Sequence, residues 1–252
     1  MSFHVSYMNV YENIAAGKDA RKAKFAVLID PEKHHGRGFA ATARLADEAG
    51  VDFLLIGGSL LSSDAMDNCL SILRQETSLP LVIFPGSTLQ VNGKADAILL
   101  LSLISGRNPD LLIGNHVIAA PYLRESGLEI IPTAYMLIES GITTTALYMS
   151  HTQPIPRLKD DIAACTAMAG EMLGLKLIYL DAGSGAIETV PESMIRKVRD
   201  TIDAPIVAGG GIRSPEKARA LVKAGASLIV VGNAIEQNNN LIAKIAEAVH
   251  QV

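Results

Sequence analysis

Two glycine-rich turns near the end of the chain constrain the fold most. The stretch from Pro205 to Glu236 reads PIVAGGGIRSPEKARALVKAGASLIVVGNAIE, in which each apolar run is followed by glycine and then by a helix signal. Ser214 before Pro215 is a favourable helix start, and glycines let backbone N–H groups approach an anion closely. Two adjacent parallel strands ending in such turns form the phosphate site of a (β/α)₈ barrel, after strands seven and eight. The alternative is two tight turns without a ligand, but GGG is more glycine than a plain turn needs.

The rest of the chain has the alternation that such a barrel requires. Continuous apolar runs such as FAVLI, AILLL and LIVV are typical of parallel strands buried on both faces, and helical patterns separate them. After the turn at residues 85–87 that ends the third strand, the connection to the fourth strand spans residues 88–94, which is too short for a full helix. We therefore predict one α/β domain spanning residues 1–252, a (β/α)₈ TIM barrel with a reduced helix after strand three.

Three segments outside this regular pattern also carry predictions. Residues 5–16 are predicted to form a leading helix, residues 142–149 an extended excursion after the fifth strand, and residues 234–249 a single closing helix. The histidines show no metal-ligand spacing and are interpreted as surface or helix residues. This applies to four of the six histidines, namely His34, His35, His116 and His151.

Composition excludes several classes of protein. The net charge of −4 and the lack of a Lys/Arg cluster argue against binding to nucleic acid. Neither a transmembrane run of about 18 apolar residues nor a signal-peptide pattern is found. Cys69 and Cys165 are far apart, which argues against a disulfide framework or a zinc site and favours the reducing cytoplasm.

Active sites of such barrels lie where the strands end. Asp30 ends the first strand before Pro31, and Ser59 follows the second strand. A carboxylate at this position suits Mg²⁺, which takes a few oxygen ligands together with substrate phosphates, but an Asp that caps the turn fits the pattern equally well. Lys33 and Arg107 lie in loops at the same end and are candidates to meet a diphosphate. Lys24 begins its strand and is expected at the opposite end.

The turn after the sixth strand, YLDAGSG, is the second informative motif. Its residues 183–185 offer backbone amides and the Ser184 hydroxyl to the same phosphate, while Asp181 is a possible base. The alternative is a solvent-exposed turn that contains an incidental acid.

These motifs taken together resemble the geranylgeranylglyceryl phosphate synthase family. The resemblance rests on LIDPEK, IGGS, VIFPGS, SLISGRNP, PTAYMLIESG, YLDAGSGA, VAGGGIRSPEKA and VVGNAIE, which cover nearly the whole chain in family order. GGGIR and GNA alone are weak, whereas YL-acid-AGSGA with DPEK and GGS is specific. The long segments around strands four and five are similar to the second group of the family, which includes bacterial and archaeal members.

The resemblance implies a Mg²⁺-dependent prenyltransferase of ether phospholipid biosynthesis. The 3-hydroxyl of sn-glycerol 1-phosphate would attack C1 of geranylgeranyl diphosphate, or of a related prenyl diphosphate, and release diphosphate. Asp30 and Ser59 would bind Mg²⁺, and Asp181 would be the catalytic acid–base group. The residues implied in holding the glycerol phosphate are Tyr179, Leu180, Asp181, Ala182, Gly183, Ser184, Gly185, Gly210, Gly211, Gly232 and Asn233. The family commonly has Glu where this chain has Asp181, so the reach of the shorter side chain is in question.

A long isoprenoid needs an apolar groove, and the candidates near strand ends are Phe84, Leu101, Tyr135 and Met136. The chain lacks a DDxxD motif, because Asp160 and Asp161 precede IAA at a helix start, which argues against the helical prenyl-elongating synthases. Two alternatives stay open: a phosphosugar isomerase or synthase on the same fold, and a non-catalytic protein that binds a phosphorylated metabolite. We also expect a homo-oligomer, and peripheral contact with a membrane for the lipid product.

Overall fold

Eight parallel strands close into a barrel in chain order, with β1 beside β8. The computed structural model describes residues 9–19, 22–33, 37–58, 63–87 and 90–252. The strands are β1 (Lys24–Ile29), β2 (Phe53–Ile56), β3 (Leu81–Ile83), β4 (Ala97–Leu103), β5 (Glu129–Leu137), β6 (Leu177–Asp181), β7 (Ile206–Gly209) and β8 (Leu228–Val231). The predicted (β/α)₈ barrel is confirmed.

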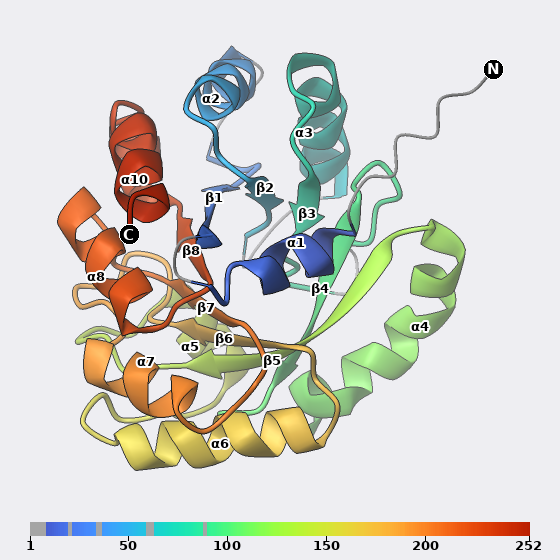
Figure 1. Cartoon of the computed structure of the whole chain (residues 1–252). Coiled ribbons are helices and arrows are strands. Elements are labelled where there is room, and N and C mark those ends of the chain that lie inside the picture. Colours follow the sequence, from blue (N-terminus) through green and yellow to red (C-terminus); the bar gives the residue numbers. More distant parts are fainter. Residues whose placement is uncertain (1–8, 20–21, 34–36, 59–62, 88–89) are drawn as a thin grey trace.

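Helices surround this barrel (Figure 1). They are α1 (Val10–Ala16), α2 (Arg37–Glu48), α3 (Ser63–Glu76), the π-helical segment η3 (Asp110–Gly114), α4 (Asn115–Ser126), α5 (Thr145–Ser150), α6 (Asp160–Met172), α7 (Glu192–Arg199), α8 (Pro215–Ala224), α9 (Asn233–Gln237) and α10 (Leu241–His250). The described residues between β3 and β4 form no α-helix, as predicted. In the part of the chain that is described, no helix is both long and apolar enough to span a bilayer.

The strands separate two apolar layers, because successive side chains point to opposite faces of a strand. In β2, Phe53 and Leu55 fill the barrel interior, whereas Leu54 and Ile56 pack against the outer helices. The interior layer is rich in aromatic and branched residues contributed by all eight strands. This layering decides which residues of a strand end can reach the barrel mouth.

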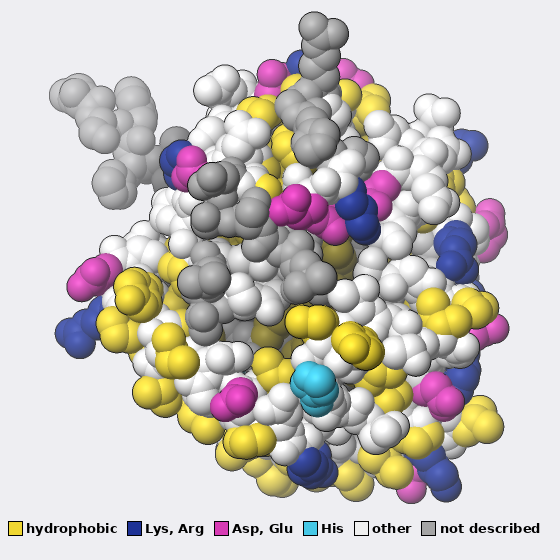
Figure 2. All heavy atoms as spheres, turned by 180° about the vertical axis from the view of Figure 1, so that it is seen from behind, with side chains coloured by type: hydrophobic (Ala, Val, Ile, Leu, Met, Phe, Trp, Pro, Cys, Tyr) yellow, Lys and Arg dark blue, Asp and Glu magenta, His cyan; other side chains and the backbone are white. Residues whose placement is uncertain are grey.

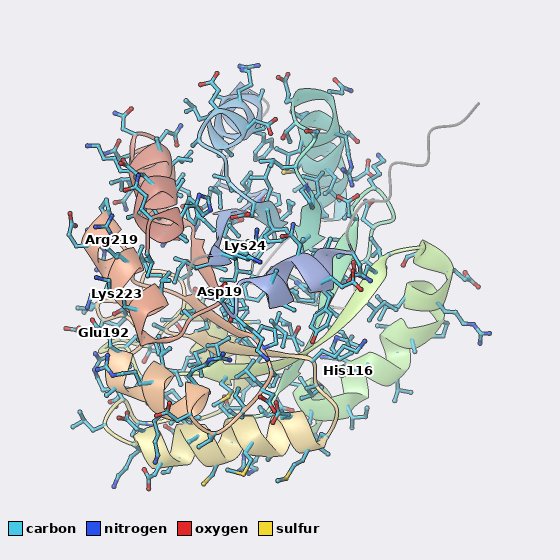
Figure 3. The ribbon with its side chains drawn as sticks, viewed as in Figure 1. Asp19, Lys24, His116, Glu192, Arg219 and Lys223 are labelled. Carbon is cyan, nitrogen blue, oxygen red and sulfur yellow. The ribbon has the colours of Figure 1, made fainter. Side chains whose placement is uncertain are left out.

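Helix α1 lies across the end of the barrel where the strands begin (Figure 1). Its Val10 and Ile14 pack on the interior layer, and the Glu129 carboxylate accepts N–H groups of Val10 and Tyr11 at 2.7 and 2.9 Å. These contacts satisfy backbone donors that the first turn of a helix leaves free. Lys24 lies at this same end, opposite the mouth, where its Nζ is 3.0 Å from Asp52 Oδ1 (Figure 3).

Three predicted segments differ from the structure. The extended excursion over residues 142–149 is wrong, because Thr144 caps the short helix α5 by accepting the N–H of Leu147. The single closing helix over 234–249 is also wrong, since residues 238–240, all Asn, interrupt it between α9 and α10. The leading helix begins at Val10, and the earlier part of its predicted range lies outside the described residues.

Candidate active site

A cavity of about 500 Å³ opens at the end of the barrel where the strands finish. Figure 2 shows this side of the molecule, with acidic and basic side chains gathered above its centre and hydrophobic side chains gathered below. The cavity likewise has two parts: glycine turns and charged groups line one, and apolar side chains of β4 and α4 line the other.

The glycine turns after β6 and β7 pack directly against each other. Gly183, Gly185, Gly210 and Gly211 all have positive φ, between 72° and 91°, a conformation that L side chains rarely adopt. A Cβ added to Gly210 would lie 2.6 Å from the backbone nitrogen of Gly183. By contrast, a Cβ on Gly185 would find its nearest heavy atom 3.8 Å away, at Asn233 Nδ2. Backbone therefore forms much of this wall and leaves space that an anion can enter.

The start of α9 completes this wall. Ser184 Oγ donates to Asn233 Oδ1 at 3.0 Å, which ties the turn after β6 to the turn after β8. The structure thus brings most of the predicted phosphate-binding residues to one place. Those that line the cavity are Tyr179, Asp181, Gly183, Ser184, Gly185, Gly210, Gly211, Gly232 and Asn233.

Two residues of the same predicted set lie differently. The side chains of Leu180 and Ala182 belong to the outer core layer and do not line this cavity. The alternation along the strand explains this, because Tyr179 and Asp181 point inward and their neighbours must point outward.

Asp181 is a buried carboxylate with two neutral hydrogen-bond donors. Its Oδ2 accepts from the Tyr135 hydroxyl at 2.5 Å, and its Oδ1 accepts from the N–H of Gly183 at 2.7 Å. Burial raises the pKa of Asp181 above its usual value, and these two hydrogen bonds oppose that rise. Only 6% of the residue is exposed. Such a group fits acid–base chemistry.

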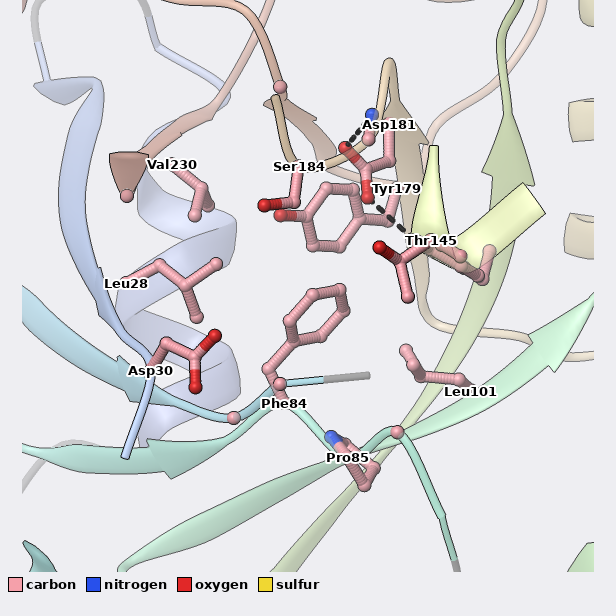
Figure 4. Close-up of a pocket in the computed structure, with 18 of the residues that line it drawn as sticks. Leu28, Asp30, Phe84, Pro85, Leu101, Thr145, Tyr179, Asp181, Ser184 and Val230 are labelled. Carbon is pink, nitrogen blue, oxygen red and sulfur yellow. Dashed lines mark hydrogen bonds between the residues drawn. The ribbon is translucent and has the colours of Figure 1, made fainter. Parts of the chain in front are cut away.

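Aromatic rings fill the centre of the cavity beside this carboxylate. Phe84 and Tyr179 stack with ring centroids 5.2 Å apart, and Tyr135 meets both rings edge-on. Figure 4 shows Asp30 and Asp181 on opposite sides of the cavity, with the rings of Tyr179 and Phe84 between them. The cavity therefore places its two candidate acids apart, with an apolar surface between them.

Asp30 lies in a small charged cluster with Lys33 and Glu236. Lys33 Nζ is 3.4 Å from Asp30 Oδ2 and 3.3 Å from Glu236 Oε2, and it donates to Asn233 Oδ1 at 3.2 Å. Glu236 lies in α9, which begins with the predicted Asn233, and the sequence pattern did not indicate it as a site residue. The other predicted metal ligand, Ser59, lies outside the described residues.

The fit of a metal to this cluster can be judged from its donors. No group of three or more His, Cys, Asp or Glu side chains able to hold a metal occurs among the described residues. Two carboxylates already flank one cation here, the Lys33 ammonium, so the cluster is built from the hard oxygen donors that Mg²⁺ prefers. A Mg²⁺ ion fits if substrate oxygens and water supply most of its ligands.

The apolar part of the cavity passes to the outer face of β4. Phe84, Leu101 and Tyr135 line the cavity as predicted, whereas Met136 faces the outer core and does not. The further apolar lining, beneath α4, consists of Val91, Ile98, Leu100, Ala119 and Leu123. The described residues between β3 and β4 form no α-helix, and the groove lies on this face of the barrel.

Three further polar side chains come from helix α4 and from loops. His116 lies on α4, in line with its interpretation as a surface or helix residue, and it also lines the cavity, with its Nε2 3.1 Å from Ser102 Oγ (Figure 3). Burial lowers the pKa of His116. Arg107 does not line the cavity and donates to the carbonyls of Ile104 and Gly106. The guanidinium of Arg213, which the sequence did not indicate, lies at the rim and donates to the carbonyl of Ala186.

Comparison with known proteins shows the family to which this chain belongs. The profile of the PcrB family matches residues 18–249. The chain belongs to the PcrB family. A geranylgeranylglyceryl phosphate synthase from Chitinophaga pinensis is 53% identical over 234 residues, which are 91% of this chain and 93% of that protein. The enzyme of the same name from Pyrococcus horikoshii is 41% identical over 222 residues, 88% of this chain and 87% of its own.

A solved structure agrees with these relatives. The (S)-3-O-geranylgeranylglyceryl phosphate synthase of Thermoplasma acidophilum, determined in complex with its substrate sn-glycerol-1-phosphate, has a TM-score of 0.92 and 36% sequence identity, covering 98% of this chain and 100% of that one. The expected membership in this family of prenyltransferases is confirmed. The tryptophan synthase α subunit of Legionella pneumophila, at 15% identity and a TM-score of 0.62, shares the fold alone.

Proposed function

We propose that this chain transfers a prenyl group from geranylgeranyl diphosphate, or a related long prenyl diphosphate, to the 3-hydroxyl of sn-glycerol 1-phosphate. A single cavity joins phosphate-type glycine turns to an apolar groove, and this observation carries the proposal. The names of the family relatives and the acceptor bound in the Thermoplasma acidophilum enzyme support the same reaction. A small, closed polar pocket would have favoured the phosphosugar isomerase, and the groove beneath α4 disfavours it.

The acceptor is assigned to the glycine turns. Backbone N–H groups at turns and helix starts favour the phosphate, and Asp181 ends the strand that leads into the first turn. The glycerol backbone is short. When the phosphate of sn-glycerol 1-phosphate is held at these turns, its 3-hydroxyl therefore reaches the neighbourhood of this carboxylate. As the bond from the acceptor oxygen to prenyl C1 forms, Asp181 takes the hydroxyl proton and the bond from C1 to the diphosphate breaks.

The donor diphosphate is assigned to the Asp30 side of the cavity. Asp30 would hold Mg²⁺, with Ser59 as the second protein ligand, and Lys33, whose Nζ lies 3.4 Å from Asp30 Oδ2, would contact the diphosphate oxygens. The ion, when bound, supplies positive charge to a leaving group that becomes negative. The aromatic rings between the two acids exclude water from the reacting carbon, and the groove beneath α4 takes the isoprenoid chain.

A variant of the groove separates this function from a polar-substrate enzyme. Ala119 lines the groove and Ala120, its neighbour on α4, is exposed. Ala119→Phe should raise the KM for the prenyl donor while leaving the affinity for glycerol 1-phosphate unchanged, and the matched control Ala120→Phe should change neither. An unchanged KM for the prenyl donor in Ala119→Phe would contradict the assignment of the prenyl chain to this groove.

Assembly and location are part of the same proposal. Several large apolar side chains are exposed on η3 and α4, namely Ile113, Val117, Ile118 and Tyr122, which is consistent with a homo-oligomer. Sedimentation showing only a 26.7 kDa monomer at micromolar concentration would contradict the oligomer. The cytoplasmic location and a peripheral membrane contact for product release stay predictions.

A further inference from the structure

The buried carboxylate of Asp181 depends on very few partners. Among the described residues, its side chain accepts one hydrogen bond from the Gly183 backbone and one from the Tyr135 hydroxyl, and no salt bridge reaches it. The cation that lines the other side of the cavity, Lys33, is engaged with Asp30, Asn233 and Glu236 instead. Within the described part of the chain, Tyr135 is thus the one side-chain donor to Asp181.

Strand register and ring packing hold Tyr135 in this position. Tyr135 on β5 pairs with Tyr179 on β6, and Leu137 pairs with Asp181, so Tyr135 approaches the carboxylate diagonally across two parallel strands. The Tyr135 ring lies edge-on to Phe84 at 5.8 Å and to Tyr179 at 5.6 Å between centroids. It is 8% exposed. A ring packed in this way has little freedom to turn its hydroxyl elsewhere.

The Tyr135 phenol does not readily lose the proton that it donates to Asp181. Burial, and then the negative charge of Asp181, raise the pKa of Tyr135 well above 10, so the phenol keeps its proton. A carboxylate has about four lone-pair sites, of which two are occupied here, so Asp181 can still accept from a substrate hydroxyl. A buried carboxyl group is protonated more readily when such a donor is removed, because only the Gly183 N–H is then left to stabilise its charge.

We propose that Tyr135 is a positioning residue for the acid–base group of this site: its hydroxyl fixes the orientation and the charge state of the Asp181 carboxylate. The acceptor proton goes to Asp181 while Tyr135 retains its own. This inference rests on the role of Asp181 in the proposed function.

The titratable groups around Asp181 define the test. Tyr135 faces it from β5 and Tyr179 from its own strand, while β7 contributes Gly209, which does not titrate. Tyr135→Phe removes the hydroxyl and keeps the ring. Tyr179→Phe is the matched control for the protonation of Asp181, not for the rate, because Tyr179 also lines the cavity. It removes a second hydroxyl of the same aromatic cluster that makes no hydrogen bond to Asp181.

The pH profile of kcat is the first measurement. In Tyr135→Phe the acidic limb should move to higher pH by about one to two pH units, since a hydrogen bond to a charged group is worth roughly ten- to a hundredfold in equilibrium. The limb should not move in Tyr179→Phe. In an Asp181→Asn background, Tyr135→Phe should cost nothing further in kcat, and an additional tenfold loss there would show that Tyr135 acts independently of Asp181.

A second measurement does not require turnover. Isotope-edited infrared spectra of protein labelled at its Asp carboxyls, with Asp181→Asn to assign the band, follow the protonation of Asp181 directly. The midpoint should rise in Tyr135→Phe and stay constant in Tyr179→Phe. If no variant forms an ether but this midpoint rises, the proposed function fails and the Tyr135 assignment stands. An unchanged midpoint in Tyr135→Phe overturns the assignment.

Discussion

The two ends of the barrel shift the pKa of an aspartate in opposite directions. Asp52, just before β2, accepts from His250 Nε2 and the Phe25 N–H, each at 2.9 Å, and from Lys24 Nζ at 3.0 Å. Burial raises its pKa, but these hydrogen bonds outweigh burial and hold the pKa below the usual value. Asp181, at the end of β6, has only neutral donors, and burial leaves its pKa raised.

The difference separates a stabilising charge from a reactive one. For Asp52, the depressed pKa means that ionisation stabilises the fold above the unfolded pKa, and this stability is lost as pH falls through the folded pKa. For Asp181 the sign is reversed, because a raised pKa means that ionisation costs stability at neutral pH and that protonation relieves the cost. The starting end of the barrel is therefore built for stability, and the mouth holds a carboxylate that can take up a proton.

The largest expected effect is at the charged cluster of the mouth. Asp30→Ala should abolish turnover and leave the far-ultraviolet circular dichroism spectrum unchanged, because Asp30 follows β1 and adds little to the core. The wild-type enzyme should lose activity in the same way when a chelator removes Mg²⁺. Full turnover by Asp30→Ala with chelator present would show that the mouth does not use a metal at this residue.

The next effect sharpens the contrast between the two aspartates. Asp181→Asn keeps the shape and removes the basic oxygen, so kcat should fall by about 10²–10⁴-fold with little change in the KM for the acceptor. Its thermal stability should not fall. Asp181→Glu tests the longer acid that the family resemblance implies, and activity should be retained or rise. A near-normal kcat in Asp181→Asn would show that Asp181 only shapes the turn and is not the acid–base group.

A third comparison uses two glycines with the same backbone conformation. Gly211 at the mouth has φ +72°, and a Cβ there would lie 2.9 Å from the Glu188 carbonyl oxygen. Gly50, after α2, has φ +69° with nothing within 4 Å of such a Cβ. Gly211→Val should raise the KM for glycerol phosphate about tenfold, the equivalent of one lost charge-assisted hydrogen bond, and raise the donor KM far less. Gly50→Val should change neither. Equal effects of Gly211→Val on both substrates would argue against two separate phosphate sites.

The smallest effect is on stability. Asp52→Asn should lower the free energy of unfolding by about 1–3 kcal/mol at pH 7, the value of hydrogen bonds to a charged group, and should leave kcat unchanged. Urea unfolding should show the difference from wild type shrinking as pH falls below the usual carboxyl pKa of 3.8. A difference that is constant with pH would mean that the charge of Asp52 contributes nothing.

Local signals in the sequence predicted the barrel and the glycine turns of the site. Apolar runs such as LIVV indicate buried parallel strands whatever their partners, and GGG with AGSG marks turns that need positive φ. These signals place Gly183 and Gly210 at the mouth before any contact is known.

Contacts between distant segments could not be predicted in this way. The hydrogen bond from Tyr135 to Asp181 joins residues 46 positions apart and depends on the register of β5 against β6. Glu236 meets Lys33 across 203 positions, through the short helix α9 that a periodic pattern merges with α10. His116 carries no metal-ligand spacing, and its contact with Ser102 depends on how α4 packs against the end of β4.

The most direct test of the mouth as a prenyl transfer site is the mass of its product. The purified protein is incubated with Mg²⁺, sn-glycerol 1-phosphate and prenyl diphosphates of several chain lengths, and the products are identified by mass spectrometry. We expect a prenyl ether of glycerol phosphate with release of diphosphate, and no ether when the acceptor or the metal is omitted. Absence of any prenyl ether with every donor, from protein that binds glycerol 1-phosphate, would contradict the proposed reaction.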